Sequence, residues 1–226
     1  MNILAIETAT PACAVGLRLA NGDEVVRVAS LERHHTESLV PLVVEVLSEA
    51  DLGPRDVTRV VVDRGPGLFT GLRVGIATAV AFAQGIGAEI VGVTSLEMLA
   101  LDAFERGVRG RVVSCVDARR GEVFVRTFEL DGSVVALDEA RVSVARRVVI
   151  EWATHGAPVT FTGDGAARYR EDFDAVPNGC VLDELVPSVR SALALGARGA
   201  PQDVVVPLYL READAVANFA TRERPK

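Results

Sequence analysis

Short apolar runs separated by turn residues open the chain, and helical patterns alternate with strand-like runs after them. The hairpin signal Asn21-Gly22-Asp23 lies between two of these runs, which therefore pair as antiparallel strands. Apolar residues then recur at helical spacing. The expected elements up to residue 106 are strands at 2–6, 12–20, 24–31, 58–62 and 89–93 and helices at 36–50, 71–85 and 95–106. Three strands followed by alternating helices and strands are the outline of a ribonuclease-H-like unit.

The second half of the chain continues the α/β pattern after a break at 107–110, where glycine and arginine end the helical periodicity. The expected elements there are strands at 111–116, 122–129 and 158–162, helices at 143–154 and 188–198, and a short helix after 163–165. The economical interpretation is an α/β protein with two subdomains, 1–106 and 107–226, each with a mixed sheet. A loose tail is expected after Arg222.

The stretch from Asp63 to Gly87 organises the first subdomain. A strand stops at the turn Arg64-Gly65-Pro66-Gly67, and Thr70 is expected to cap a helix over 71–85. This helix is apolar nearly all round, so it needs a cover besides the chain's own sheet. Its small residues recur at four-residue spacing, which lets another backbone approach closely. The pattern therefore predicts a helix-to-helix interface with a partner.

A glycine-rich turn between a strand and a helix also raises the question of a phosphate site. The G-x-x-x-x-G-K-[ST] pattern is missing, because Leu72 follows Gly71 and no lysine comes after it. The G-x-G-x-x-G pattern within an opening βαβ unit is missing as well. The sequence therefore favours packing over phosphate binding at this turn.

Charge and cysteine content narrow the class of protein. The net charge of −7 argues against binding of nucleic acid by this chain alone. Three cysteines without C-x-x-C spacing favour a reducing compartment over disulfides or zinc. The N-terminus meets Glu7 too early for a signal peptide, and no apolar run of membrane-spanning length is free of polar interruption. A cytoplasmic protein with no membrane contact is expected.

Catalytic and metal-binding patterns are absent from the sequence. His34 and His35 are adjacent, which a helix would splay apart, and His155 is distant, so a metal site is not expected. No serine lies in a G-x-S-x-G motif. His34 and His35 precede the first helix, where capping or contact with a partner is the expected role, and a buried structural role is the alternative. No catalytic, cofactor-binding or metal-ligating residue is assigned.

Several segments resemble the TsaB family, also called YeaZ. They are NILAIETATPACAVGL, HHTESLVPLV, GPGLFTGLRVGIATAVAFA, VTSLEMLA, DARRGEVF and PLYLREADA, which together span essentially the whole chain. The resemblance implies an actin-like ATPase fold of two halves. It also implies a non-catalytic subunit that binds and activates a TsaD-like transferase, which forms threonylcarbamoyladenosine in transfer RNA. Leu68 departs from the family pattern, which usually has serine there.

The resemblance further implies that ATP and metal bind to the TsaD-like partner and not to this chain. A TsaE-like ATPase in the larger complex, a homodimer when the chain is alone, and transfer RNA contact only through the complex are also implied. An ATP-dependent enzyme of the same fold, an ATPase or sugar kinase, stays open as the alternative, and a peptidase is a weaker one. The expected partner interface consists of His34, His35, Thr36, Leu39, Val43, Gly71, Leu72, Gly75, Thr78, Ala79 and Phe82.

Overall fold

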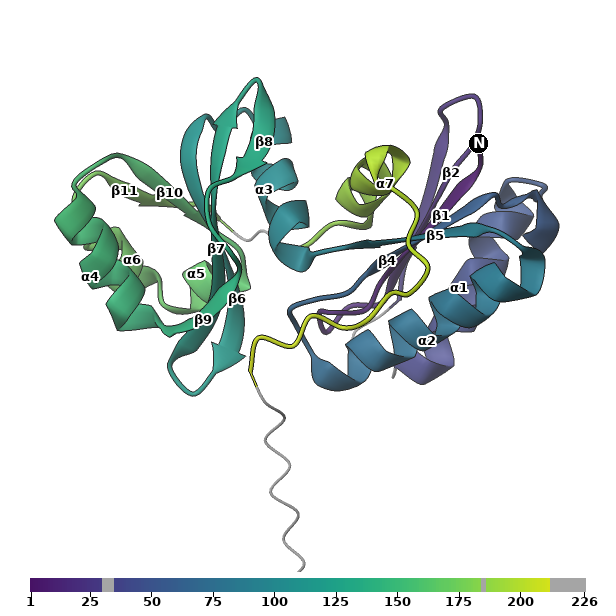
Figure 1. Cartoon of the computed structure of the whole chain (residues 1–226), viewed down its shortest axis with the longest axis horizontal. Helices are drawn as coiled ribbons and strands as arrows, with labels where there is room; N and C mark the ends of the chain where they lie inside the picture. Colours follow the sequence, from purple (N-terminus) through teal and green to yellow (C-terminus); the bar gives the residue numbers. More distant parts are fainter. Residues whose placement is uncertain (30–34, 184–185, 212–226) are drawn as a thin grey trace, which may run out of the picture.

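The chain folds into two α/β halves, each built on one mixed sheet (Figure 1). The structure is a computed structural model, and it describes residues 1–29, 35–183 and 186–211. Strand order in the first sheet is β3-β2-β1-β4-β5. In the second sheet it is β11-β10-β6-β7-β8, with β9 also paired to β7. Both sheets thus place their first strand in the centre, between the hairpin partner and the next parallel strand.

The first sheet consists of an antiparallel meander joined to two parallel strands. Its strands are β1 (Ile3–Glu7), β2 (Ala14–Arg18), β3 (Glu24–Val28), β4 (Arg59–Asp63) and β5 (Glu89–Val93). β1 pairs antiparallel with β2 and parallel with β4, so it is covered on both edges. All five of its residues are buried, which explains why they form a continuous apolar run up to Glu7.

Helices cover both faces of this sheet. α1 (His35–Glu49) and α2 (Phe69–Ile86) pack on one face. The short 3-10 helix η1 (Pro54–Asp56) lies between α1 and β4 in the chain. α7 (Val189–Arg198) packs on the other face, against β1, β2 and β4. Alternate residues of β1 therefore enter two different cores, Leu4 and Ile6 under the helix pair and Ile3 and Ala5 under α7.

The start of α2 differs from the sequence expectation. The helix begins at Phe69, its N-cap residue is Leu68, and no side chain caps it. The prediction that Thr70 caps a helix beginning at Gly71 is therefore wrong, because Thr70 already lies inside the first turn. The predicted end is nearly right, since Gly87 terminates the helix with a left-handed backbone, φ 73°.

The second sheet is built from one long hairpin and shorter strands around it. Its strands are β6 (Gly110–Arg119), β7 (Glu122–Asp131), β8 (Ser133–Ala136), β9 (Arg141–Val144), β10 (Val159–Thr162) and β11 (Gly179–Val181). One face carries α4 (Ala145–His155), α5 (Asp164–Arg168) and α6 (Arg170–Asp174). The sequence did not predict β8, β9, β11 or α6, which are only three to five residues long.

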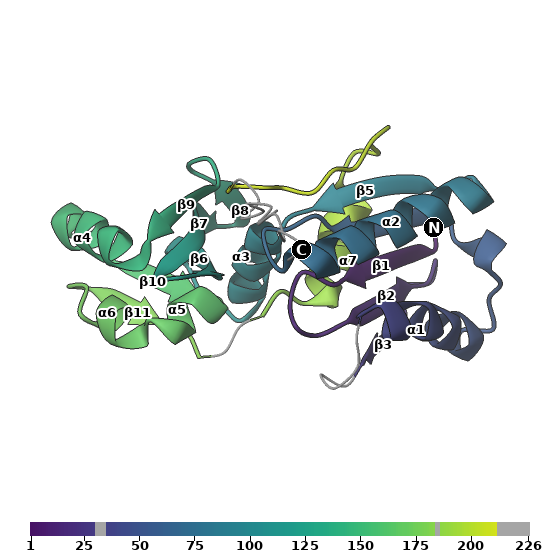
Figure 2. The ribbon, with the colours of Figure 1, turned by 90° about the horizontal axis from the view of Figure 1, so that it is seen from below.

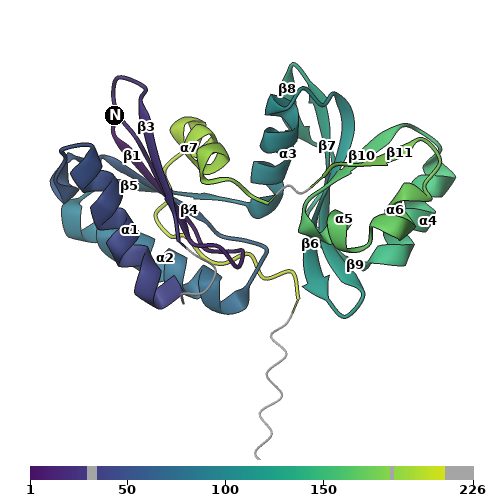
Figure 3. The same ribbon diagram turned by 180° about the vertical axis from the view of Figure 1, so that it is seen from behind.

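One helix from each part of the chain packs on the other part's sheet. α3 (Ser95–Glu105) follows β5 but packs against β6, β7 and β8, whereas α7 returns from the second half to the first sheet (Figures 2 and 3). The two helices also touch: Asp102 of α3 accepts hydrogen bonds from the Ser188 amide at 3.1 Å and the Ser188 hydroxyl at 2.7 Å. The halves are thereby joined by more than their linker, and a boundary at 106/107 stays a prediction.

Among the described residues, α2 has the length and hydropathy of a helix that crosses a membrane, although Arg73 and Gln84 interrupt its apolar run. Leu72, Ile76, Ala79 and Ala83 of this helix are buried in the chain itself. They pack over β1 and β4, which is the position of a core helix.

Candidate functional site

Segments at the ends of four strands meet in a cleft between the halves. Two belong to the first half and follow β1 and β4, and the second half contributes the last residues of β6 and the start of α5, which follows β10. The cavity between them measures about 210 Å³. It is lined by Ala9, Thr10, Pro11, Pro66, Gly67, Leu68, Phe69, Val116, Asp117, Ala118, Arg119, Phe124, Asp164, Pro187 and Arg211.

The turn after β1 is closed by its own acid. The carboxylate of Glu7 accepts hydrogen bonds from the amides of Ala9 at 2.7 Å and Thr10 at 3.0 Å. It also accepts one from the Thr10 hydroxyl at 3.1 Å. Backbone amides of such a turn are the groups that would cradle a phosphate. Here these two amides are taken by a buried side chain, so the turn presents few donors to a ligand.

The carboxylate of Asp63 closes the turn after β4, as that of Glu7 closes the turn after β1. Its carboxylate accepts hydrogen bonds from the Gly65 amide at 2.8 Å and from the Ser95 hydroxyl at 2.7 Å. Because β1 and β4 are parallel neighbours, Glu7 and Asp63 stand side by side at the ends of the two strands. Burial, and then the charge of Asp63, raise the pKa of Glu7 to about 8. Burial also raises the pKa of Asp63 to about 7.

The second half presents a matching pair of acids, Asp117 and Asp164. The Asp164 carboxylate accepts a hydrogen bond from the Asp117 amide at 3.1 Å, and burial raises the pKa of Asp164. Asp117 forms ion pairs with Arg119 at 3.0 Å and Arg168 at 3.6 Å. Over the described part of the chain, no group of three or more His, Cys, Asp or Glu side chains is arranged to hold a metal ion.

The small residues of α2 face the chain's own first turn. A Cβ atom added to Gly71 would overlap the carbonyl oxygen of Thr8, and one added to Gly75 would overlap the Thr8 hydroxyl oxygen. The Thr8 hydroxyl donates a hydrogen bond to the Gly71 carbonyl at 2.9 Å. The expectation that a partner helix crosses at Gly75 is therefore corrected: the close approach is to β1 and its turn. Leu72 and Ala79 are buried on the same side.

The predicted residues of α1 are divided between core and surface. Leu39 and Val43 are buried in the first core, and Thr36 is exposed. His35 donates through Nε2 toward the carbonyls of Thr10, at 2.9 Å, and Ala12, at 3.0 Å. This imidazole therefore ties the start of α1 to the turn after β1. His34 lies outside the described residues.

The outer surface of α1 and α2 carries exposed apolar side chains besides the predicted interface residues. On α1, Val40 is 58% exposed and Val44 is 60% exposed. On α2, Ala77 and Ala81 are exposed, and the predicted residues Thr78 and Phe82 are half-buried. We call the set Val40, Val44, Ala77, Thr78, Ala81 and Phe82 the outer face. Its signal in the sequence is the four-residue spacing of Val40 and Val44 opposite the core stripe.

A C-terminal segment, residues 199–211, crosses both halves and is called the strap here. It lies along β5, where the Gln202 amide donates to the Ile90 carbonyl at 2.9 Å. Farther on, the ring of Tyr209 stacks on Phe69 with 5.4 Å between centroids, and Arg73 lies 3.8 Å above the Phe69 ring. Arg211 ends the described strap at the second half, within 2.8 Å of the Glu122 carboxylate.

Two α/β halves with the same strand order, joined across a cleft, define an actin-like ATPase fold. The family model described as TsaD, tRNA N6-adenosine threonylcarbamoyltransferase, matches residues 27–217. The tRNA threonylcarbamoyladenosine biosynthesis protein TsaB of Escherichia coli (strain K12) is 32% identical over 165 residues, 69% of this chain and 71% of that protein. This chain belongs to the TsaB (YeaZ) family.

Two further comparisons cover nearly the whole chain. The TsaB protein of Bacillus subtilis (strain 168) is 29% identical over 236 residues, which cover 99% of this chain and 100% of that protein. The solved structure of YeaZ from Pseudomonas aeruginosa superposes with a TM-score of 0.80 at 28% identity, over 92% of this chain and 99% of that chain. Both halves and the connection between them therefore have counterparts in the family.

Proposed function

We propose that this chain is a non-catalytic scaffold subunit. It binds and activates a TsaD-like threonylcarbamoyltransferase in forming N6-threonylcarbamoyladenosine at the adenosine next to the tRNA anticodon. Membership of the TsaB family supports a role in this modification, and the names of its relatives state that role for them. The match to the TsaD model supports a partner of related fold. A cytoplasmic location is consistent with a role in modifying transfer RNA.

The observation that carries the proposal is the outer face of α1 and α2. Val40 and Val44 of α1 are more than half exposed, and Ala77 and Ala81 of α2, the helix that α1 contacts, are exposed as well. Exposed apolar side chains on two adjacent helices indicate an interaction site, because binding removes their apolar surface from water. We expect a helix pair of a second actin-like protein to cover this surface. The same face serves a homodimer when the transferase is absent.

The cleft supports a non-catalytic role. The Glu7 carboxylate occupies the amides of Ala9 and Thr10, and the Leu68 amide donates to the Ala9 carbonyl at 2.7 Å. The backbone groups of the two turns of the first half thus have hydrogen-bond partners within this chain. We assign ATP and metal to the TsaD-like partner, a TsaE-like ATPase to the larger complex, and transfer RNA contact to the complex as a whole.

The test is binding of the TsaD-like transferase by chains with a charge placed on the outer face. Val44→Asp and Val40→Asp should each weaken association at least about tenfold, because a carboxylate would be desolvated in the interface. Ile150→Asp is the matched control, since Ile150 is 58% exposed but lies on α4 in the second half. Sedimentation and calorimetry would measure association, with thermal unfolding to verify the fold.

Equal binding by all three variants would reject the outer face as the interface. Calorimetry with ATP and magnesium separates the scaffold from an enzyme of the same fold. Tight magnesium-dependent binding to the isolated chain would favour an ATPase or sugar kinase, whose nucleotide would lie in the 210 Å³ cleft. No binding, together with activation of transferase turnover by this chain, is the result that the scaffold proposal expects.

A further inference from the structure

A second polar cavity lies where the strap passes between the two sheets. Its volume is about 510 Å³. Arg64 and Gly92 contribute to it from the first sheet and its loop, Arg126 from β7, and Gln202 from the strap. The site is separate from the cleft described above, with which it shares no lining residue.

Arg64 brings an uncompensated positive charge to this cavity. The residue is half-buried, and its guanidinium forms no ion pair or hydrogen bond with any residue that the structure describes. Its backbone is fixed on both sides, because the Arg64 amide donates to the Val93 carbonyl at 2.9 Å and the Leu208 amide donates to the Arg64 carbonyl at 2.7 Å. A guanidinium that is partly removed from water and lacks an acceptor gains free energy when an anion supplies the missing hydrogen-bond acceptors.

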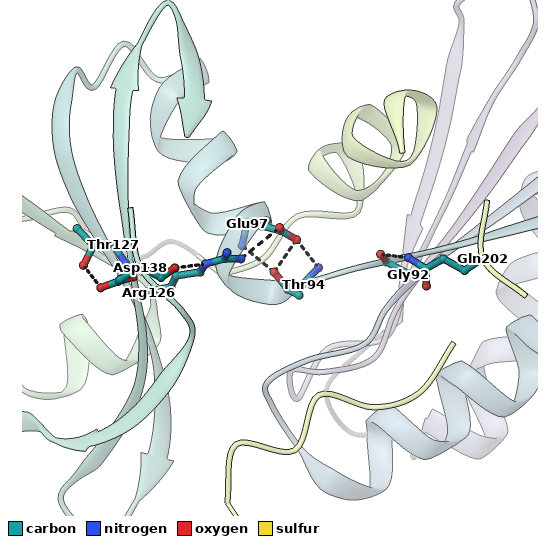
Figure 4. A network of polar contacts seen from close by, with 7 residues as sticks. All are labelled: Gly92, Thr94, Glu97, Arg126, Thr127, Asp138 and Gln202. Atoms are coloured by element: carbon teal, nitrogen blue, oxygen red, sulfur yellow. Dashed lines mark hydrogen bonds and ion pairs between the residues drawn. The ribbon is translucent and has the colours of Figure 1, made fainter. Parts of the chain in front are cut away.

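Gly92 of β5 leaves space for the side chain of Arg64. A Cβ atom added to Gly92 would lie 3.0 Å from Cδ of Arg64, 2.9 Å from Cγ1 of Val205 and 3.2 Å from Oε1 of Gln202. The lack of a side chain at Gly92 therefore leaves space for the aliphatic part of Arg64 and for the side-chain amide of Gln202. That amide donates to the Gly92 carbonyl at 3.4 Å (Figure 4). Gly92 is thus part of the construction of the cavity.

The acids of the cavity do not neutralise Arg64. Figure 4 shows that both carboxylate oxygens of Glu97 accept hydrogen bonds, one from Thr94 and the other from Arg126. Its Oε2 accepts from the Thr94 amide at 3.1 Å and the Thr94 hydroxyl at 2.7 Å, and its Oε1 accepts from Arg126 at 3.4 Å. Arg126 also donates through Nε to the Asp138 carbonyl at 3.0 Å, which leaves Nη2 without a described partner. Glu139, the remaining acid of the lining, is an exposed residue.

We propose that this cavity binds a small anion, a carboxylate or a phosphate group, with Arg64 as the principal ligand residue. Both groups offer two oxygens to the planar fork of a guanidinium. Arg126 and Gln202 supply further donors from the second sheet and the strap. A bound anion would therefore connect three segments that are far apart in the sequence. The proposal does not depend on the function proposed above.

The test is titration of the full chain with inorganic phosphate and, in a separate arm, with acetate and succinate at constant ionic strength. Amide resonances of Gly92 and Thr94 would report binding in the cavity. Saturable shifts in either arm support the site, and the arm that saturates identifies the anion. Arg64→Gln should weaken the binding at least about tenfold, because charge-assisted hydrogen bonds are lost. Arg55→Gln, at an exposed arginine of η1, should leave it unchanged.

Gly92→Ala provides a second variant, which displaces Arg64 and Gln202 without removing a charge. It should also weaken the binding. The proposal is overturned if neither anion gives saturable shifts of Gly92 and Thr94. It is equally overturned if folded Arg64→Gln protein binds as tightly as the unchanged chain, or if Arg55→Gln loses as much affinity as Arg64→Gln.

Discussion

Gly75→Ala should destabilise this protein, because the new methyl group has no room. It would overlap the hydroxyl oxygen of Thr8 and lie 3.4 Å from its Cβ and 3.6 Å from Cγ2 of Ile6. The hydroxyl must therefore leave the Gly71 carbonyl, to which it now donates at 2.9 Å, or α2 must move away from β1. Either adjustment occurs in a region where Thr8 and Ile6 are fully buried.

The magnitude follows from three contributions. Overpacking costs about 1–3 kcal/mol, and loss of one buried hydrogen bond costs about 1 kcal/mol. Replacing glycine by alanine within a helix returns about 1 kcal/mol. We expect a net loss of about 2 kcal/mol in the free energy of unfolding. For a chain of this size that loss lowers the melting temperature by about 4–8 °C.

Thermal unfolding of Gly75→Ala and Gly85→Ala provides the measurement. Gly85 lies in the same helix, and a Cβ there would meet no atom within 4 Å, so its replacement should be neutral or stabilising. Thr8→Ala removes the overlapping oxygen, so the double variant Thr8→Ala/Gly75→Ala should lose less stability than the two single losses added together. Equal melting temperatures for the Gly75 and Gly85 variants would refute the inward packing of Gly75.

Two further predictions concern buried acids and a helix cap. The folded chain holds Glu7 and Asp63 at pKa values of about 8 and 7, above the ordinary 4.5 and 3.8, so it binds protons that the unfolded chain releases. The free energy of unfolding should therefore fall as pH rises from about 5 to about 8, and Glu7→Gln should flatten that slope; identical slopes would contradict the assignment. Thr94 caps α3 by accepting from the Glu97 amide at 3.2 Å, so Thr94→Ala should cost about 1 kcal/mol, and an unchanged melting temperature would exclude this cap.

The order of strands and helices along the first half could be predicted because each element has a strong local signal. β1 and β4 are apolar runs that are buried on both faces. Each ends in an acid, Glu7 or Asp63, and a turn with proline follows it, joined by two glycines only after β4. β8 and β11 carry no such signal, since they are only four and three residues long and pair at the edges of the second sheet. Their existence depends on neighbouring strands that the local sequence does not specify.

The direction in which a residue faces was harder to predict than the element that contains it. Small residues at four-residue spacing on α2 correctly indicated a close approach, but Gly71 and Gly75 approach Thr8 of the same chain. A helix that is apolar nearly all round gives no periodic signal for which side meets the sheet. The valines of α1 at positions 40 and 44 show the reverse case, because their exposure appears only when the rest of the helix is seated on the sheet.

The buried acids connect the cleft with the outer face. Burial raises the pKa values of both Glu7 and Asp63, which means that the folded state disfavours their charged forms. The carboxylates nevertheless order the turns after β1 and β4. The turn after β1 holds the start of α2, because the Thr8 hydroxyl donates to the Gly71 carbonyl and the Ala9 carbonyl accepts from the Leu68 amide. Because α2 carries part of the outer face, a change at Glu7 should reach the partner-binding surface without any direct contact between them. Weakened association with the TsaD-like transferase in folded Glu7→Ala protein, with normal association in Glu7→Gln protein, is the expected pattern. Equal association by both variants would show that α2 keeps its position without the Glu7 hydrogen bonds.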